Sequence, residues 1–218
     1  GRIKYPVIYL DFVSGNYTVG SITLIDKIRV ALQKYEDENG IQFEEIIIKK
    51  RIETLDDKIK KDQLWLESYL LSFRLEYDLE AVFNKTGLQT VMIVDEYDNP
   101  LIKSVNIETD KDIYRGFFSV LKSADRYIRF AFLTGVTKFA KTSIFSGTNQ
   151  PEDITDNKKF SAICGVTHEE LIANFSPEIE KLAQHQDLTF DECIAELKHW
   201  YDGYLFHENG EKVFNPDD

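Results

Sequence analysis

The sequence predicts an α/β fold built on a mainly parallel sheet and followed by a small helical subdomain. Three short apolar segments have the length and composition of buried strands, and long segments with helical spacing of apolar residues lie between them. Strands that alternate with helices favour a parallel sheet, because each helix carries the chain back to the edge where the next strand starts. The tail has few such strands and several helix-start signals.

The expected strands cover residues 6–12, 90–96 and 127–134. Each is an apolar run with glycine, proline or polar residues close by, as buried parallel strands usually are. A fourth apolar segment, residues 43–48, contains three consecutive isoleucines. Because a short apolar run fits a strand and a buried helix equally well, this segment is left open between the two.

Helices are expected between these strands. One ends at Asn39–Gly40, a C-terminal signal, and another covers residues 55–84 with two apolar stripes, which predicts burial on two sides. Thr109 and Asp112 have the spacing of a capping box, so we expect the next helix to start there.

The chain changes character after the third strand, where residues 146–160 are polar. We therefore expect two domains: an α/β core at residues 1–148 and a helical subdomain at residues 149–218. Three helix starts are expected in the subdomain, and they follow Thr167, Ser176 and Thr189.

Composition excludes several classes of protein. Of the 218 residues, 43% are hydrophobic and 29% charged, which is typical of a globular protein, and no apolar run approaches the roughly 20 residues that span a bilayer. The net charge of −12 disfavours direct binding to nucleic acid, which usually requires a basic face. Two isolated cysteines fit a reducing compartment, so a cytoplasmic location is expected.

The strongest chemical signal is a pair of acids, Asp95 and Glu96, directly after the second strand. In parallel α/β sheets, ligands bind beyond the carboxyl ends of the strands. One carboxylate there can hold Mg²⁺ beside nucleotide phosphates, and its neighbour can orient or deprotonate the attacking water. This is the arrangement of a Walker B strand, although buried strands that end in acids also occur in many other folds.

Thr134 ends the third strand, where a hydroxyl can sense the terminal phosphate of a nucleotide or cap a turn. A phosphate-binding loop should accompany a Walker B strand: Gly, four residues, Gly, Lys and then Ser or Thr. The nearest match begins at Gly15 and reaches Gly20–Ser21 without the lysine, so it is interpreted as a strand-to-helix turn. The histidines and cysteines lack zinc-ligand spacing, and no Gly-x-Ser-x-Gly elbow is present.

The segment Val-Asp-Glu-Tyr-Asp-Asn-Pro at residues 94–100 resembles the AAA-ATPase-like family of bacterial P-loop NTPases. Further blocks, in the order that the family shows, lie at residues 6–11, 132–146, 160–171, 200–204 and 214–216. Together these blocks cover nearly the whole chain and are far more specific than the acid pair alone.

The resemblance implies a P-loop NTPase-like three-layer domain. It assigns Asp95 to Mg²⁺ and nucleotide binding and Glu96 to the role of catalytic base, and it suggests that Thr134 is the sensor. ATP and Mg²⁺ would be the cofactors of the full-length parent. Members of the family carry a Gly-Lys-Ser loop upstream of the first strand and often a C-terminal PD-(D/E)XK nuclease-like domain. We expect this chain to begin after the loop, to end before the nuclease-like domain and to be inactive alone.

The leading hypothesis is an ATP-binding, ATPase-like module that regulates an attached effector domain in a larger bacterial protein. The alternative is a non-catalytic protein-interaction module with a vestigial nucleotide site. A nuclease would need a further carboxylate and a lysine in matching positions, and no such set was found. A homo-oligomer is left open. An arginine finger for a neighbouring subunit could come from Arg115, Arg126 or Arg129, but surface ion pairs are the more common use of such residues.

Overall fold

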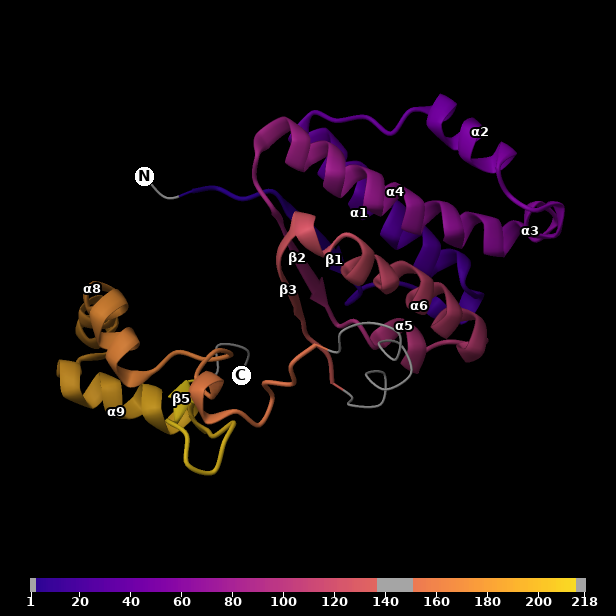
Figure 1. The fold of residues 1–218 in the computed structure, drawn as a ribbon. Coiled ribbons are helices and arrows are strands. Elements are labelled where there is room, and N and C mark those ends of the chain that lie inside the picture. The colour runs from indigo at the N-terminus through magenta and orange to yellow at the C-terminus, as the bar shows by residue number, and fades with distance from the viewer. Residues whose placement is uncertain (1–2, 137–150, 215–218) are drawn as a thin grey trace. The chain divides into compact units, whose positions relative to one another are not determined.

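The computed structural model describes residues 3–136 and 151–214. The chain divides into two compact units, residues 1–150 and residues 151–218. The first is called here the α/β unit and the second the C-terminal unit; Figure 1 shows the elements of both.

The α/β unit contains a parallel sheet of three strands in the order β1-β2-β3. The strands are β1 (Val7–Asp11), β2 (Thr90–Asp95) and β3 (Ile128–Leu133). The predicted α/β fold with a parallel sheet, followed by helices, is therefore confirmed. The acid-bearing strand β2 is central, so both neighbouring strands end beside it.

Helices α1, α4 and α6 pack together in one layer, and α1 also packs on β1 (Figure 1). The helices of this unit are α1 (Ile22–Asn39), α2 (Glu45–Glu53), α3 (Asp57–Lys61), α4 (Gln63–Thr86), α5 (Asn99–Ile102) and α6 (Ile107–Ser123), with 3-10 turns η1 (Tyr17–Val19) and η2 (Asp125–Tyr127). Left-handed glycines end α1 at Gly40 and α4 at Gly87, as the sequence indicated.

The core of the α/β unit lies between the sheet and this helical layer. The strands contribute Ile8, Leu10, Met92 and Val94, each at most 1% exposed, and the helices contribute buried leucine, isoleucine and aromatic side chains. Alternate residues of a strand point to opposite faces, so these four side chains define one face of the sheet.

The opposite face of the sheet, called here the open face, consists of Val7, Tyr9, Val91, Ile93, Phe130 and Phe132. The strand register aligns Val7 with Val91 and Phe130, and Tyr9 with Ile93 and Phe132. Val7, Tyr9 and Phe130 are exposed, at 38%, 46% and 52%. Parallel sheets are normally covered on both faces, so this much accessible apolar surface is unusual.

The structure resolves one local feature that the sequence left open and differs from the sequence predictions in two others. Residues 45–48 belong to helix α2, which resolves the ambiguous isoleucine run. Helix α6 begins at Ile107 after Asn106, so Thr109 lies in its first turn and the capping box predicted there was wrong. The helical segment at 55–84 is broken at Asp62, whose carboxylate accepts a hydrogen bond from Trp65 N (3.0 Å) and starts α4.

Of the two apolar stripes predicted on α4, one is buried and one is half-buried. Leu71, Leu75, Leu79 and Val82 lie in the core. Leu66, Leu70, Phe73 and Tyr77 remain partly exposed. The ring of Phe43 packs against Phe73 and Tyr77, so a loop residue and not a second helix provides part of their cover.

The C-terminal unit combines two helices with a small antiparallel sheet. Its elements are η3 (Lys158–Phe160), α8 (His168–Gln186), α9 (Phe190–Tyr201), β4 (Asp202–Tyr204) and β5 (Val213–Phe214). Its helical core contains Ile179, Ala183, Cys193 and Ile194. The pairing of β4 with β5 was not predicted from the sequence.

Helix starts at Thr167 and Thr189 are confirmed. Thr167 Oγ1 accepts from Glu170 N, and Glu170 Oε2 accepts from Thr167 N, which completes a capping box. The start predicted at Ser176 was wrong, because Ser176–Pro177 lies inside α8. Ser176 Oγ donates to Ile172 O (2.6 Å), so its hydroxyl bonds back into the helix instead of capping a new one.

Among the described residues, no helix is both long and apolar enough to cross a membrane.

Candidate functional site

Two acidic residues lie at one edge of the sheet. Asp11 ends β1 and Asp95 ends β2, and the two residues are partners in the strand register. Because β1, β2 and β3 are parallel, their carboxyl ends meet at this edge, where α/β proteins bind ligands. Asp95 points to the same side of the sheet as the open face. Tyr9 on that face donates its hydroxyl hydrogen bond to Asp95 Oδ2 (3.2 Å).

Thr134, which follows β3, joins the acid pair directly. Its hydroxyl donates to Asp95 Oδ1 (2.5 Å) and accepts from the backbone N–H of Glu96 (3.3 Å). The backbone supports this contact, since Thr134 N donates to Val94 O and Tyr97 N donates to Thr134 O, both at 2.9 Å. The structure therefore brings together all three predicted site residues, Asp95, Glu96 and Thr134.

Glu96 has a left-handed backbone conformation, with φ of 47°. Left-handed conformations cost a residue with a side chain roughly 1–3 kcal/mol and persist where the surrounding structure imposes them. Here the imposing contacts are the hydrogen bonds of Glu96 N to Thr134 Oγ1 and of Asn99 N to Glu96 O (3.0 Å). Local strain of this kind is concentrated at functional sites.

Asn99 connects the loop after β1 to the loop after β2 by hydrogen bonds. Its side-chain amide donates to Phe12 O (2.6 Å) and to Val13 O (3.1 Å), and the residue is only 7% exposed. In the sequence, Asn99 was noted only as part of the segment 94–100 that carries the family resemblance. A polar side chain that bonds two carbonyls of a distant loop leaves no local sequence signal.

Asp98 makes the corresponding connection to the loop after β3. It is 1% exposed and its Oδ1 accepts from Val136 N (3.3 Å). At Gly135, a Cβ atom would lie 2.5 Å from Asp98 Oδ1 and 2.6 Å from the Tyr97 ring, so only glycine permits this approach. Asp98 and Asn99 together hold the loops of β1 and β3 against the acid pair.

The glycine-containing segment after β1 forms a closed turn. Tyr17 is 1% exposed, and its hydroxyl donates to Phe12 O (3.3 Å) and Ser14 O (3.2 Å). A Cβ at Gly15 would lie 2.7 Å from the Tyr17 ring. Burial, and then the charges of Asp11 and Glu96, raise the pKa of Tyr17 to about 12, so its hydroxyl keeps its proton. Gly15 is therefore needed here because it leaves space for the ring of Tyr17.

The oxygen atoms at this edge fit a hard divalent cation. A carboxylate offers about four lone-pair sites, and Asp95 uses one on each oxygen, for Thr134 and for Tyr9. Within residues 3–136 and 151–214, no three His, Cys, Asp or Glu side chains group into a metal site. Mg²⁺ is usually bound by only one or two carboxylates with water and phosphate oxygens, and Asp95 has the lone-pair sites for one such contact. Burial, and then Asp95, raise the pKa of Tyr9, which keeps this hydroxyl a donor.

Comparison with known proteins places the chain in a family. Residues 2–145 match the AAA-ATPase-like family, which is described as "Predicted AAA-ATPase". The chain belongs to this family. The match covers the acid pair and Thr134, so the site described above lies within the residues matched to the family.

One relative is an uncharacterized protein in the vnfD 5′ region of Azotobacter chroococcum mcd 1. It is 38% identical over 136 residues, which are 61% of this AAA-ATPase-like chain and 24% of that protein. The chain thus spans about a quarter of the length of this relative. No solved structure matches this chain.

Several of the sequence blocks that carry the family resemblance lie outside the site. Residues 137–146 of the sensor block and residues 215–216 of the closing block are outside the described residues. The blocks at 160–171 and 200–204 fall in the C-terminal unit, beyond the residues matched to the AAA-ATPase-like family.

Proposed function

We propose that this chain supplies the metal-binding and water-activating part of an ATP site in a larger bacterial protein. Membership of the AAA-ATPase-like family supports an ATPase-like module. The observation that carries the proposal is the junction of Asp95, Glu96 and Thr134 at the carboxyl edge of a parallel sheet, with the central strand bearing the acids.

Each residue has a distinct role in this proposal. Asp95 holds Mg²⁺, directly or through water, and Mg²⁺ supplies neutralisation of phosphate charge when it is bound. Glu96 orients the attacking water and accepts its proton. Thr134 holds the two acids in register; its one hydroxyl proton is donated to Asp95, so contact with a phosphate requires the hydroxyl to rotate.

The phosphates of ATP also need hydrogen-bond donors, which a phosphate-binding loop normally supplies, and this sequence contains no standard loop of that kind. No Gly-x-x-x-x-Gly-Lys-Ser/Thr segment occurs in the 218 residues. In this proposal another segment of the parent polypeptide holds the phosphates, and the nucleotide state regulates an attached effector, a C-terminal nuclease-like domain by the resemblance.

Calorimetry with Mg·ATP tests the proposal on two proteins: this chain, and a longer version extended upstream through any phosphate loop of the parent. We expect binding by the longer version and its loss on Asp95→Ala. Asp26→Ala is the matched control, because Asp26 is an exposed acid on α1 whose removal changes net charge equally. Unchanged affinity in the Asp95 variant would refute the metal role.

The open face favours a second candidate, a non-catalytic interaction module with a vestigial site. Val7, Tyr9 and Phe130 present apolar side chains that a partner protein would cover. Asp95 and Thr134 also satisfy one another without a metal. If neither version binds Mg·ATP, this second candidate is favoured.

A further inference from the structure

A groove of about 470 Å³ lies in the helical layer, between α4, α6 and the end of α2. Its volume falls within the range of small-molecule sites, which is about 300–1,000 Å³. None of its lining residues belongs to the acid-bearing edge of the sheet. It is therefore a separate feature of the α/β unit, and inference from it does not depend on the proposed ATP site.

The two long walls of the groove differ in chemistry. On α4, Trp65, Tyr69 and Phe73 follow one another at four-residue spacing, which places them on one side of the helix. The rings of Trp65 and Tyr69 are stacked, with centroids 5.4 Å apart and planes within 9°. The wall formed by α6 contains Gly116, Ser119 and Ser123. Gly116 lies opposite Ser68 and Ser72 of α4, so both helices contribute small side chains to the groove.

Arg51 of α2 provides a cation in the groove wall. Its guanidinium carbon lies 4.9 Å from the centroid of the Phe73 ring and 5.4 Å from that of Tyr69. Its Nε is buried and has no hydrogen-bond partner in the described part of the chain. A buried donor without an acceptor is costly, so the site is incomplete as it stands.

The acidic side chains at the groove are already paired or exposed to solvent, whereas Arg51 Nε is buried without a partner among the described residues. Asp62 is engaged in capping α4 through Trp65 N (3.0 Å), and Asp112 is paired with Arg115 Nη1 (2.6 Å). Glu76 is exposed to solvent. These carboxylates still make the surroundings negative, which opposes a multiply charged anion and leaves a single negative charge as the best complement to Arg51.

We propose that this groove binds a small planar aromatic molecule with one carboxylate. The rings of the ligand would lie along Trp65, Tyr69 and Phe73, against the small side chains of α6. The carboxylate would accept hydrogen bonds from Arg51, whose planar guanidinium suits two parallel contacts to a carboxylate.

Binding of 2-naphthoate to the whole chain tests the proposal, with the uncharged 2-naphthylmethanol as the matched ligand. The protein has two tryptophans, so ¹H–¹⁵N NMR resolves their indole N–H signals, and Trp200→Phe assigns them. We expect 2-naphthoate to shift the Trp65 signal saturably, with a Kd on the order of 1 mM or tighter, and to leave Trp200 unchanged. We also expect the alcohol to bind roughly ten-fold more weakly, because it lacks the charge-assisted contacts.

Three variants locate the site. Arg51→Gln should weaken 2-naphthoate roughly ten-fold and leave the alcohol unchanged. Lys50→Gln is the control, since it removes the same charge one residue away, outside the groove lining. Gly116→Leu should abolish binding of both ligands, because a Cβ there meets only Ser72 Oγ at 3.8 Å and Ser68 Oγ at 3.9 Å and the longer side chain would extend into the groove.

The proposal is overturned if the Trp65 signal does not move, if Gly116→Leu binds as the unmodified chain does, or if Arg51→Gln weakens both ligands equally. Circular dichroism checks that each variant is folded. If Arg51→Gln does not fold, the ligand pair on the unmodified chain decides: equal affinity for the acid and the alcohol overturns the role of Arg51.

Discussion

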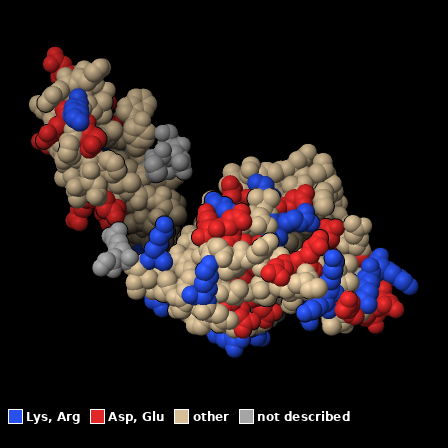
Figure 2. All heavy atoms as spheres, turned by 90° about the horizontal axis from the view of Figure 1, so that it is seen from above, with Lys and Arg blue, Asp and Glu red and all other residues tan. Residues whose placement is uncertain are grey.

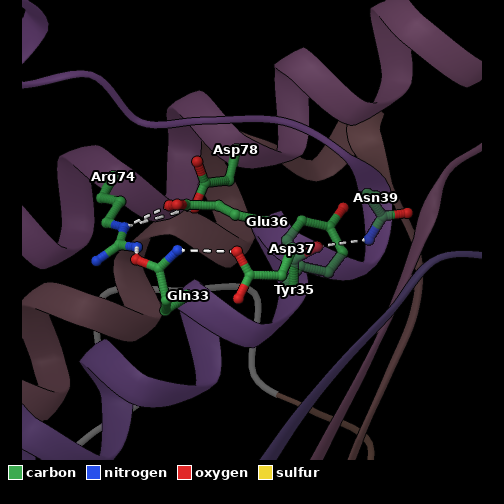
Figure 3. A network of polar contacts seen from close by, with 7 residues as sticks. All are labelled: Gln33, Tyr35, Glu36, Asp37, Asn39, Arg74 and Asp78. Carbon is green, nitrogen blue, oxygen red and sulfur yellow. Dashed lines mark hydrogen bonds and ion pairs between the residues drawn. The ribbon is translucent and has the colours of Figure 1, made fainter.

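Replacing Asp78 with asparagine should stabilise the α/β unit at neutral pH. Asp78, on α4, is 0% exposed, and it lies beside Glu36 of α1, which is 2% exposed (Figure 3). Arg74 Nε contacts Glu36 Oε1 at 2.5 Å but is 4.0 Å from Asp78 Oδ2. No described hydrogen-bond donor reaches either carboxylate oxygen of Asp78, and the Tyr35 hydroxyl nearby is bonded to Thr90. Two buried carboxyls therefore lie next to each other, with one cation that is bonded to Glu36.

The magnitude follows from the pKa of this carboxyl. Burial, and then the charge of Glu36, raise the pKa of Asp78 from 3.8 to about 9. Between these values the unfolded chain has lost the proton and the folded chain retains it, so stability falls as pH rises, by about 1.4 kcal/mol per pH unit. At pH 7 the accumulated loss is up to about 4 kcal/mol, and below pH 3.8 it disappears. Asparagine is uncharged in both states and still offers Glu36 a donor.

Urea denaturation from pH 6 to pH 8.5 measures this effect. The free energy of unfolding of the unmodified chain should fall with rising pH more steeply than that of Asp78→Asn, and the variant should be more stable at pH 7. Glu76→Gln is the control, because Glu76 is an exposed acid on the same helix. A variant that is no more stable than the unmodified chain and keeps its pH dependence would show that Asp78 is ionised in the folded protein.

Three other substitutions probe the site and the C-terminal unit by denaturation. Asn99→Ala should cost about 1–3 kcal/mol because it removes the two hydrogen bonds to Phe12 O and Val13 O, whereas Asn84→Ala, on the exposed side of α4, should cost less than about 0.5 kcal/mol; equal costs would contradict the role of the amide. Glu96→Gly should be about 1 kcal/mol more stable than Glu96→Ala, because glycine adopts positive φ freely; no difference would mean that the backbone there is unstrained. Thr167→Ala should destabilise the C-terminal unit by about 1 kcal/mol, and an unchanged midpoint would contradict the observed capping box.

The sequence was sufficient for the strands and for the parallel sheet, because burial imposes a strong pattern. The apolar run before Asp95 needs a two-sided environment, and the spacing of Ile25, Ile28 and Leu32 needs a helix. Local hydrogen-bonding signals were less decisive. Thr109 and Ser176 have the right neighbours for helix starts, yet each lies inside a helix that begins earlier, because packing of the surrounding apolar face continues past them.

The predicted site residues came from position along the chain, and the structure adds the contacts that join them. That Asp95, Glu96 and Thr134 lie at the same sheet edge follows from parallel strands, so it was accessible from the sequence. The bond from Thr134 to Asp95 and the connection by Asn99 depend on register and loop path, which no periodicity records. The left-handed conformation of Glu96 was also not predictable, because glutamate rarely adopts it.

The open face and the net charge of −12 have opposite effects on the behaviour of this chain in concentrated solution. Like charges keep molecules apart over about a Debye length, while the apolar side chains of the open face attract once that repulsion is removed. Acidification toward the isoelectric point near pH 4.9 removes the charge, and high salt screens it. Low ionic strength and mildly alkaline buffer should therefore keep the chain dispersed, and the same chain should become turbid as either condition is reversed.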